Sequence, residues 1–148
     1  MSSYLRVLEV KDLEMILSYE EKKRREQFST EEEIIFAGWD SQARKEALEF
    51  YLPLGWSFVD FSENSGGSNM SGYFLAQPML FVESKTQSLW VEHLQFNSIK
   101  TRDELCQMVY RLARDRHFQR IYFPQSVQNG LAEYKYSEWG KDRIIVTL

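Results

Sequence analysis

The sequence predicts a single-domain, mixed α/β protein built around a mostly antiparallel sheet. Its 148 residues and 43% hydrophobic content suit one ordinary domain, residues 1–148, with a continuous core. Segments with the two-residue period of strands occur among segments with the helical period. Three strand-like runs follow one another in the middle of the chain without a helix between them, which is typical of antiparallel pairing.

The first third of the chain is expected to form a strand and then helices. Tyr4–Val10 alternates apolar and polar residues, and Asp12 can cap the helix that follows. The apolar residues of this helix are Leu13, Ile16, Leu17 and Tyr19. It ends in the charge run EEKKRREQ, which we interpret as a solvated face with local ion pairs and without a function.

Two further helical segments are predicted before the sheet. Thr30 and Glu33 form a capping-box pattern. A second piece runs through QARKEALEFYL with Asp40 or Ser41 as its cap, and Pro53 and Gly55 end it. Its inward residues are expected to be Ala43, Ala47, Leu48 and Tyr51.

The middle of the chain contains the three strand-like runs. WSFVDFSE is followed by NSGGSNMSG, whose glycines indicate a hairpin loop, and GYFLAQPMLFVE returns. Pro78 cannot donate a ladder hydrogen bond, so a bulge or a splayed edge is expected partway along this strand. In SLWVEHLQF, strict alternation places Trp90, Glu92, Leu94 and Phe96 on one face and Leu89, Val91, His93 and Gln95 on the other.

The last third of the chain returns to helical spacing. A helix is expected from Thr101, with Leu105, Val109, Leu112 and Ala113 on its inward face. HFQRIYFP is typical of a turn into a strand, Ser126–Trp139 is predicted to be a last helix ended by Gly140, and RIIVTL a final strand.

The composition argues against several classes of partner. The net charge of −4 repels polyanions, and the basic cluster Lys22–Arg25 has acidic neighbours, so no nucleic acid is expected. Cys106 is the single cysteine and no signal pattern is visible, which indicates a cytoplasmic protein. No apolar run approaches the roughly 20 residues that cross a bilayer, so no membrane is expected. His93 and His117 lack partners at metal-ligand spacing, so we expect no metal.

The order of elements resembles that of the GNAT (GCN5-related N-acetyltransferase) superfamily. WVEHLQF and a helix ending ARDRHFQRIYF are similar to that family's fourth strand, third helix and fifth strand, where a phrase close to WARERGFKRIYL is common. His117 stands where the family often has glycine. Asn129, Ala132, Tyr136 and Gly140 match the family's N-x-x-A-x-x-x-Y-x-x-x-G motif. The resemblance implies a sheet splayed near its middle strands, helices on both faces, and acetyl-CoA or another acyl-CoA as donor.

The segment after WVEHLQF departs from this family. There the family typically has R/Q-x-x-G-x-G/A, whose backbone amides hold the pyrophosphate of acetyl-coenzyme A, and this chain has NSIKTRDEL without glycine. Ile99 and Thr101 suit the required backbone torsions poorly. We expect Asn97–Arg102 to form a weakened donor site, or one for a different donor.

Side chains of the same segment also affect an anion. Thr101 and Glu104 form a capping-box pattern that would consume amides, and Asp103 adds negative charge. Lys100 and Arg102 can offset this charge, although as point charges. The residues that the resemblance assigns to the cofactor are Leu94, Phe96, Lys100, Thr101, Arg102 and Asn129.

Acyl transfer needs a base for the attacking amine and an acid for the leaving thiolate. Glu92, among apolar neighbours, is the predicted base, and its alternative is a carboxylate at the sheet margin paired with an arginine. Tyr136 matches the family's general acid, and its alternative is a packing residue on the last helix. Asn129 is either a cofactor-orienting residue or a helix cap, and His93 and Cys106 are interpreted as structural.

The predicted function is therefore an N-acyltransferase that acts on a small-molecule or protein amine. Two alternatives stay open: a catalytically inactive GNAT-fold binding module, and an acyltransferase fed by a carrier protein that docks on a basic patch near Lys100 and Arg102. A homodimer could use Trp39, Trp56 or Trp139, for which a place in the core is the default.

Overall fold

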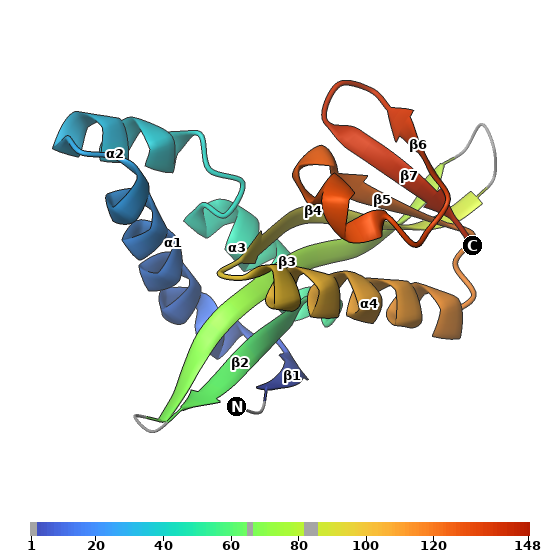
Figure 1. Ribbon diagram of the computed structural model, residues 1–148, viewed down its shortest axis with the longest axis horizontal. Helices are drawn as coiled ribbons and strands as arrows, with labels where there is room; N and C mark the ends of the chain where they lie inside the picture. Colours follow the sequence, from blue (N-terminus) through green and yellow to red (C-terminus); the bar gives the residue numbers. More distant parts are fainter. Residues whose placement is uncertain (1–2, 65–66, 82–85) are drawn as a thin grey trace.

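The computed structural model describes residues 3–64, 67–81 and 86–148. Within them one sheet has the strand order β1-β2-β3-β4-β5-β7-β6 (Figure 1). The strands are β1 (Ser3–Val7), β2 (Phe58–Asn64), β3 (Gly67–Phe81), β4 (Thr86–Phe96), β5 (Arg120–Pro124), β6 (Tyr136–Trp139) and β7 (Arg143–Thr147). The helices are α1 (Leu13–Gln27), α2 (Glu31–Trp39), α3 (Lys45–Tyr51) and α4 (Ile99–Asp115), with 3₁₀ turns η1 (Val10–Asp12), η2 (Leu52–Leu54) and η3 (Gln125–Leu131). The predicted mixed, mostly antiparallel fold class is confirmed.

The sheet opens between β4 and β5. These two strands are the parallel pair, and their register runs only from Ser88 opposite Arg120 to Trp90 opposite Tyr122. Beyond Trp90, β5 no longer accompanies β4. Pro78 itself stays in the β3–β4 register opposite Leu89, so β3 does not splay there, and the irregularity of this strand pair lies between Leu75 and Ala76.

A β-bulge interrupts β4 at Glu92. His93 lies opposite Leu75 and Val91 opposite Ala76, so Glu92 is an extra residue in the ladder. Because the bulge shifts the alternation by one residue, the predicted division of faces is wrong after Val91. Leu94 joins the core under α4 together with Val91, and His93 turns to the face that carries α1.

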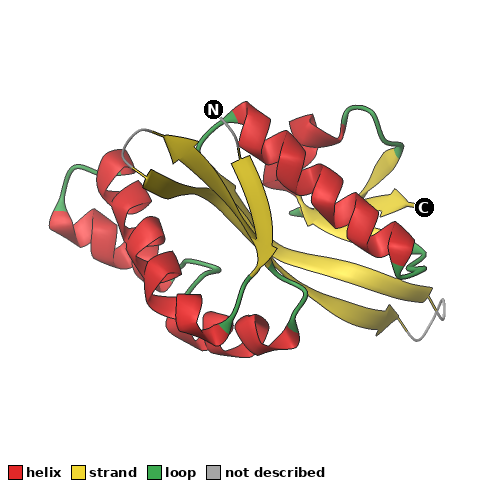
Figure 2. Cartoon of the chain, turned by 90° about the horizontal axis from the view of Figure 1, so that it is seen from below, coloured by secondary structure: helices red, strands yellow, loops and turns green. Residues whose placement is uncertain are grey.

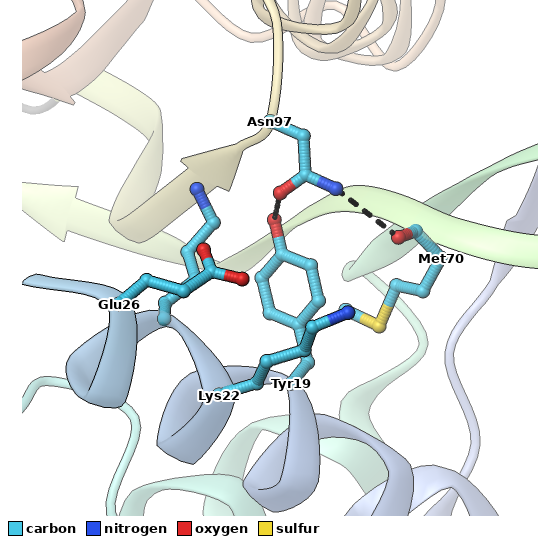
Figure 3. Close-up of a pocket in the computed structure, with 6 residues that line it drawn as sticks. Tyr19, Lys22, Glu26, Met70 and Asn97 are labelled. Atoms are coloured by element: carbon cyan, nitrogen blue, oxygen red, sulfur yellow. Dashed lines mark hydrogen bonds between the residues drawn. The ribbon is translucent and has the colours of Figure 1, made fainter.

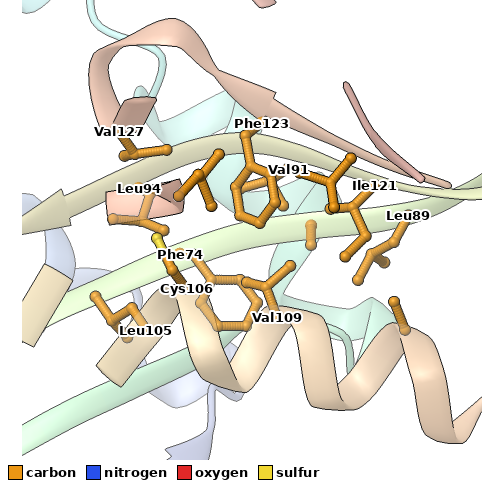
Figure 4. Close-up of a cluster of buried hydrophobic side chains, with 14 of the residues drawn as sticks. Phe74, Leu89, Val91, Leu94, Leu105, Cys106, Val109, Ile121, Phe123 and Val127 are labelled. Carbon is orange, nitrogen blue, oxygen red and sulfur yellow. The ribbon is translucent and has the colours of Figure 1, made fainter. Parts of the chain in front are cut away.

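Two hydrophobic cores lie on the two faces of the sheet, with α4 on one face and α1 to α3 on the other (Figure 2). The α4 core draws on β3, β4, β5, β7 and η3 (Figure 4). Its members include Phe74, Leu89, Val91, Leu94, Leu105, Val109, Ile121, Phe123, Val127 and Ile144. The other core includes Leu8, Ile16, Leu48, Tyr51, Val59, Tyr73 and Leu75.

The first turn of α4 begins two residues earlier than predicted. Ser98 is its N-cap and its Oγ accepts from the Thr101 amide at 3.2 Å. The predicted capping box of Thr101 with Glu104 is therefore wrong. Gly72 on β3 permits close approach here, since an added Cβ would lie 2.6 Å from the Gln95 carbonyl oxygen and 2.8 Å from Thr101 Cγ2.

The predicted helix Ser126–Trp139 is wrong. Its first part is the 3₁₀ turn η3, and its second part pairs with β7 as strand β6. Asn129 and Gly130 are poor helix formers, and Gly140, at φ +74°, instead makes the turn into β7. The motif residues Asn129 and Tyr136 therefore lie on different elements.

Other boundaries moved by a few residues. Thr30 caps α2 as predicted, but α3 starts only after Arg44, since Ser41 Oγ accepts from the Ala43 amide in a separate turn. Most of the predicted hairpin loop pairs as the start of β3, and its residues 65–66 lie outside the described chain. His117 has φ +60°, the left-handed conformation that glycine favours.

The three tryptophans considered for an interface differ in burial. Trp39 is 63% exposed, which contradicts the default of a core position. Trp139 is also exposed, although its ring contacts Trp90 and Tyr122 edge-on. Trp56 is partly buried against Phe118.

Candidate functional site

A cleft of about 280 Å³ lies where β4 and β5 separate, and we call it the splay cleft. β4 contributes Glu92 and His93, and the opposite wall comes from the end of β5, η3 and the turn into β7. Its lining residues are Gln42, Glu92, His93, Pro124, Gln125, Ser126, Lys141, Asp142 and Arg143.

The carboxylate of Glu92 is held by three neighbours. Oε2 accepts from Trp90 Nε1 at 2.7 Å and from the Tyr51 hydroxyl at 3.4 Å. Arg143 Nη2 lies 3.4 Å from the same oxygen. Burial, and then the charge of Glu92, raises the pKa of Tyr51 to about 12. Glu92 is thus paired with an arginine, as in the alternative interpretation given for it above.

Arg143 reaches across the opening from β7. Its Nη1 donates to the Val91 carbonyl at 2.5 Å, and its guanidinium carbon lies 4.2 Å from the centre of the Trp90 ring. Its side chain is 11% exposed. The edge of β4 that β5 leaves free is therefore partly occupied by this guanidinium.

A second cleft, of about 370 Å³, opens between α1, α2 and β4, and we call it the helix cleft. It is lined by Glu20, Arg24, Gln27, Phe28, Ala37, Asp40, Ser41, Gln42, His93 and Gln95. Gln42 and His93 line both clefts. His93 therefore lies where the two clefts approach each other.

The ring of His93 is oriented by a buried carboxylate on α1. His93 Nε2 lies 3.0 Å from Glu20 Oε1, and the Tyr73 hydroxyl donates to the same oxygen. Burial by itself raises the pKa of Glu20, but the hydrogen bonds from His93 and Tyr73 outweigh it and hold this pKa below its ordinary value. Glu20 is therefore ionised at neutral pH. With Nε2 donating to this carboxylate, a neutral His93 keeps its Nδ1 lone pair free.

The predicted donor segment, Asn97–Arg102, contains the start of α4. It has no glycine, but in the described chain some of its backbone amides are not hydrogen-bonded. Among the described residues, no acceptor is hydrogen-bonded to the backbone amide of Ile99 or of Lys100. Lys100 is exposed, and its Nζ lies 3.9 Å from Glu104 Oε1. Arg102 forms an ion pair with Asp103, in which Nη2 lies 3.1 Å from Oδ1. The Arg102 side chain also covers Gly130, where an added Cβ would lie 2.9 Å from its Nε. Of the two basic residues expected to form a docking patch for a carrier protein, only Lys100 is thus exposed.

On the α1 side, the end of β4 adjoins a pocket of about 270 Å³ (Figure 3). Its lining residues are Tyr19, Lys22, Lys23, Glu26, Met70 and Asn97. Lys23 Nζ donates to the Phe96 carbonyl at 2.5 Å, and the Tyr19 hydroxyl donates to Asn97 Oδ1 at 2.8 Å. These contacts fasten the end of β4 to α1.

The other predicted site residues are dispersed. Leu94 is buried in the α4 core, and Phe96 packs against it. Asn129 is exposed within η3, so it caps no helix. Tyr136 lies on β6, 37% exposed, and its hydroxyl accepts from Gln128 Nε2 at 3.2 Å. Tyr136 and Asn129 line neither cleft.

Sequence reasoning missed Glu20, Lys23 and Arg24. The charge run on α1 is a solvated face only in part: Arg25 pairs with Glu21 and Glu31, but Lys23 and Arg24 turn toward the protein. A signal was available, because Glu20 and Arg24 continue the helical face of Ile16 at steps of four residues.

No family model matches the chain, and no curated protein matches it in sequence. In structure, the chain has the fold of the GNAT superfamily, as the sequence resemblance predicted. One similar solved structure is the PaiA N-acetyltransferase of Thermoplasma acidophilum in complex with coenzyme A, with a TM-score of 0.65 and 15% identity over 100% of both chains. The polyamine N-acetyltransferase of Drosophila melanogaster has a TM-score of 0.64 and 10% identity over 99% of this chain and 100% of its own. The NatC complex bound to Gag peptide and coenzyme A has a TM-score of 0.64 and 12% identity over 100% of this chain and 99% of its own.

The described residues also bear on membrane spanning and metal binding. None of their helices combines the length and apolar character that a membrane span requires. They also hold no group of three His, Cys, Asp or Glu residues arranged for a metal ion.

Proposed function

We propose that this protein is an N-acyltransferase that transfers an acyl group from a coenzyme A thioester to an amine. The observation that carries the proposal is the position of His93, which lines both clefts and is hydrogen-bonded to the buried carboxylate of Glu20. Group transfer between two substrates needs a base where they meet, and a histidine oriented by a carboxylate is suited to it. The GNAT-fold neighbours named as N-acetyltransferases support the same reaction class.

The donor thioester lies in the splay cleft and the amine in the helix cleft. His93 Nδ1 takes a proton from the amine as its nitrogen bonds to the thioester carbonyl carbon, while Nε2 stays hydrogen-bonded to Glu20. The tetrahedral intermediate then collapses, the carbon–sulfur bond breaks, and the thiolate takes a proton. That proton returns from His93, because Tyr136, the acid that the sequence resemblance implies, lines neither cleft.

The donor would be held by elements on either side of the opening. The Ile99 and Lys100 amides at the start of α4, with the exposed Lys100 ammonium, offer donors to a phosphate, although fewer than a glycine loop. The acyl arm would run along the β4 edge beyond Trp90. There it must displace Arg143 from the Val91 carbonyl.

Thiol release from acetyl-CoA in the presence of agmatine, spermidine, free amino acids or a peptide with a free N-terminus tests the proposal. We expect His93→Gln to lower kcat by about 100-fold, in the range of a lost general base, and to leave acetyl-CoA affinity unchanged. Glu92→Gln and Tyr136→Phe, measured beside it, test the base and acid that the sequence predicts. Wild-type protein that binds acetyl-CoA and acylates no amine would refute the proposal, as would an unimpaired His93→Gln variant.

Two observations favour a second candidate, a GNAT-fold module without catalysis. Arg143 is buried across the β4 edge and bonded there, and α4 starts without glycine. Such a module would show no calorimetric binding of acetyl-CoA, either as wild type or with Arg143→Ala.

A further inference from the structure

The helix cleft contains Arg24, an arginine that no acidic side chain of the described residues pairs with. The Arg24 side chain lies against α2, where an added Cβ on Gly38 would be 3.6 Å from Nε and 3.7 Å from Nη2. Its Nε is buried and has no hydrogen-bond partner, and within the described chain its guanidinium forms no ion pair. Leaving a buried donor unpaired is unfavourable, so an acceptor at this position would be stabilising.

The local sequence would lead one to expect a partner for Arg24. Glu20 precedes it by four residues, the spacing at which helical ion pairs form. The next such pair on α1 does form, since Arg25 Nη2 lies 3.0 Å from Glu21 Oε1. Glu20 is instead taken by His93 and Tyr73. Because Glu20 contacts His93 and Tyr73, it forms no ion pair with Arg24. Arg24 and His93 line the same cleft.

The charges of the helix cleft indicate what it would bind. A guanidinium matches the geometry of a carboxylate. A doubly charged phosphate would be opposed by Glu20 and Asp40, which line the same cleft as Arg24. Asp40 has no ion-pair partner in the described part of the chain and can attract an ammonium group. The cleft therefore offers one cation and a free anion, the complement of a zwitterion.

We infer that the amine acceptor carries a carboxylate, and that Arg24 binds this carboxylate while the amino group faces His93. The acceptor is then an amino acid or a molecule with the same two groups. This inference rests on the proposed function, because it names the substrate class of the same site. Arg24 is a specificity residue in it, since it contacts the part of the acceptor that does not react.

The experiment compares each of the twenty L-amino acids with its carboxamide, at millimolar concentration, by thermal unfolding and by acyl transfer from acetyl-CoA. Thermal unfolding reports binding without any need for catalysis. The variants are Arg24→Gln and Arg24→Lys, and Arg25→Gln is the matched control on the same helix, because Arg25 already has its ion pairs. The melting temperature of each variant without ligand shows whether it is folded.

We expect one or more amino acids to raise the melting temperature of the wild type and of Arg25→Gln, and their carboxamides to fail. Arg24→Gln should lose the shift, and Arg24→Lys should recover part of it. Transfer to the same amino acid should show a KM at least about tenfold higher in Arg24→Gln, the loss of one charged contact. Carboxamides that bind or react as well as the acids, an unaffected Arg24→Gln variant, or no shift with any amino acid would overturn the inference.

The outcomes also separate this inference from the proposed function. Amino acids that bind through Arg24 and are never acylated would leave the carboxylate site standing and refute the transferase. Amines without a carboxylate that are acylated through His93 would leave the transferase standing and refute the carboxylate site.

Discussion

Asp60 makes the stability of this protein depend on pH in an unusual direction. It lies on β2 with 0% exposure, and in the described chain neither carboxyl oxygen has a hydrogen-bond partner. Burial, and then interaction with the Glu104 carboxyl group, raises the pKa of Asp60 from 3.8 to about 7. Ser3 Oγ donates to Glu104 at 3.2 Å, so Glu104 is already engaged with β1.

The direction of this pH dependence follows from the number of protons bound in the folded and unfolded states. Between about pH 4 and pH 7 the folded protein holds a proton on Asp60 that the unfolded chain releases, so the free energy of unfolding falls as pH rises through this window. Below the window the group has no effect, and above it the full cost applies. A shift from 3.8 to about 7 corresponds to roughly 4 kcal/mol.

The variant Asp60→Asn removes this titration and keeps the shape of the side chain. We expect its advantage over the wild type in urea unfolding to be larger at pH 8 than at pH 5 by roughly 3 kcal/mol. Glu104→Gln is the comparison variant, and it should keep the part of the pH dependence that comes from burial, the largest single cause. Parallel stability profiles of Asp60→Asn and wild type between pH 5 and pH 8 would refute the reasoning.

Gly72→Ala should lower the free energy of unfolding, measured by urea titration, by about 2–4 kcal/mol, because the added Cβ would lie 2.6 Å from a backbone oxygen. Gly55 has open space around it but a φ of +80°, so Gly55→Ala should lower the same free energy by only about 1 kcal/mol. Equal losses would contradict this. Arg143→Ala should strengthen calorimetric binding of acetyl-CoA about tenfold by freeing the β4 edge, and weaker binding would mean that the guanidinium contacts the donor. Cys106 is buried and burial raises its pKa to about 12, so a disulfide reagent at pH 8 should label the folded protein at least about 100-fold more slowly than the urea-unfolded chain; fast labelling of the folded chain would show an open α4 core.

Much of the fold could be read from the sequence. The strands within Tyr4–Val10 and SLWVEHLQF, the cap at Thr30 and the stop at Pro53 and Gly55 were predicted from local features, and the structure contains each of them as predicted or within a few residues. Local features suffice there because a strand period or a helix cap depends on neighbours within about one turn. The last predicted helix failed because β6 exists only through its pairing with β7.

The candidate site was harder to predict than the fold. Glu92 was recognised as a carboxylate that an arginine could pair, but its partner Arg143 is 51 residues away. His93 was assigned to the wrong environment because the bulge at Glu92 is a property of the β3–β4 register. The charges of α1 were read as solvated because their pattern is polar.

The sequence by itself determined the class of fold, the order of its elements as far as β5, and the absence of glycine where α4 begins. These depend on composition, local periodicity and residue identity, all of which are written in the chain. Only the tertiary structure decided which charged groups meet. Glu20 turns to His93 rather than to Arg24, and Arg143 spans the opening of the sheet, because residues distant in sequence compete for the same partner. That competition is settled by packing, which no local pattern records.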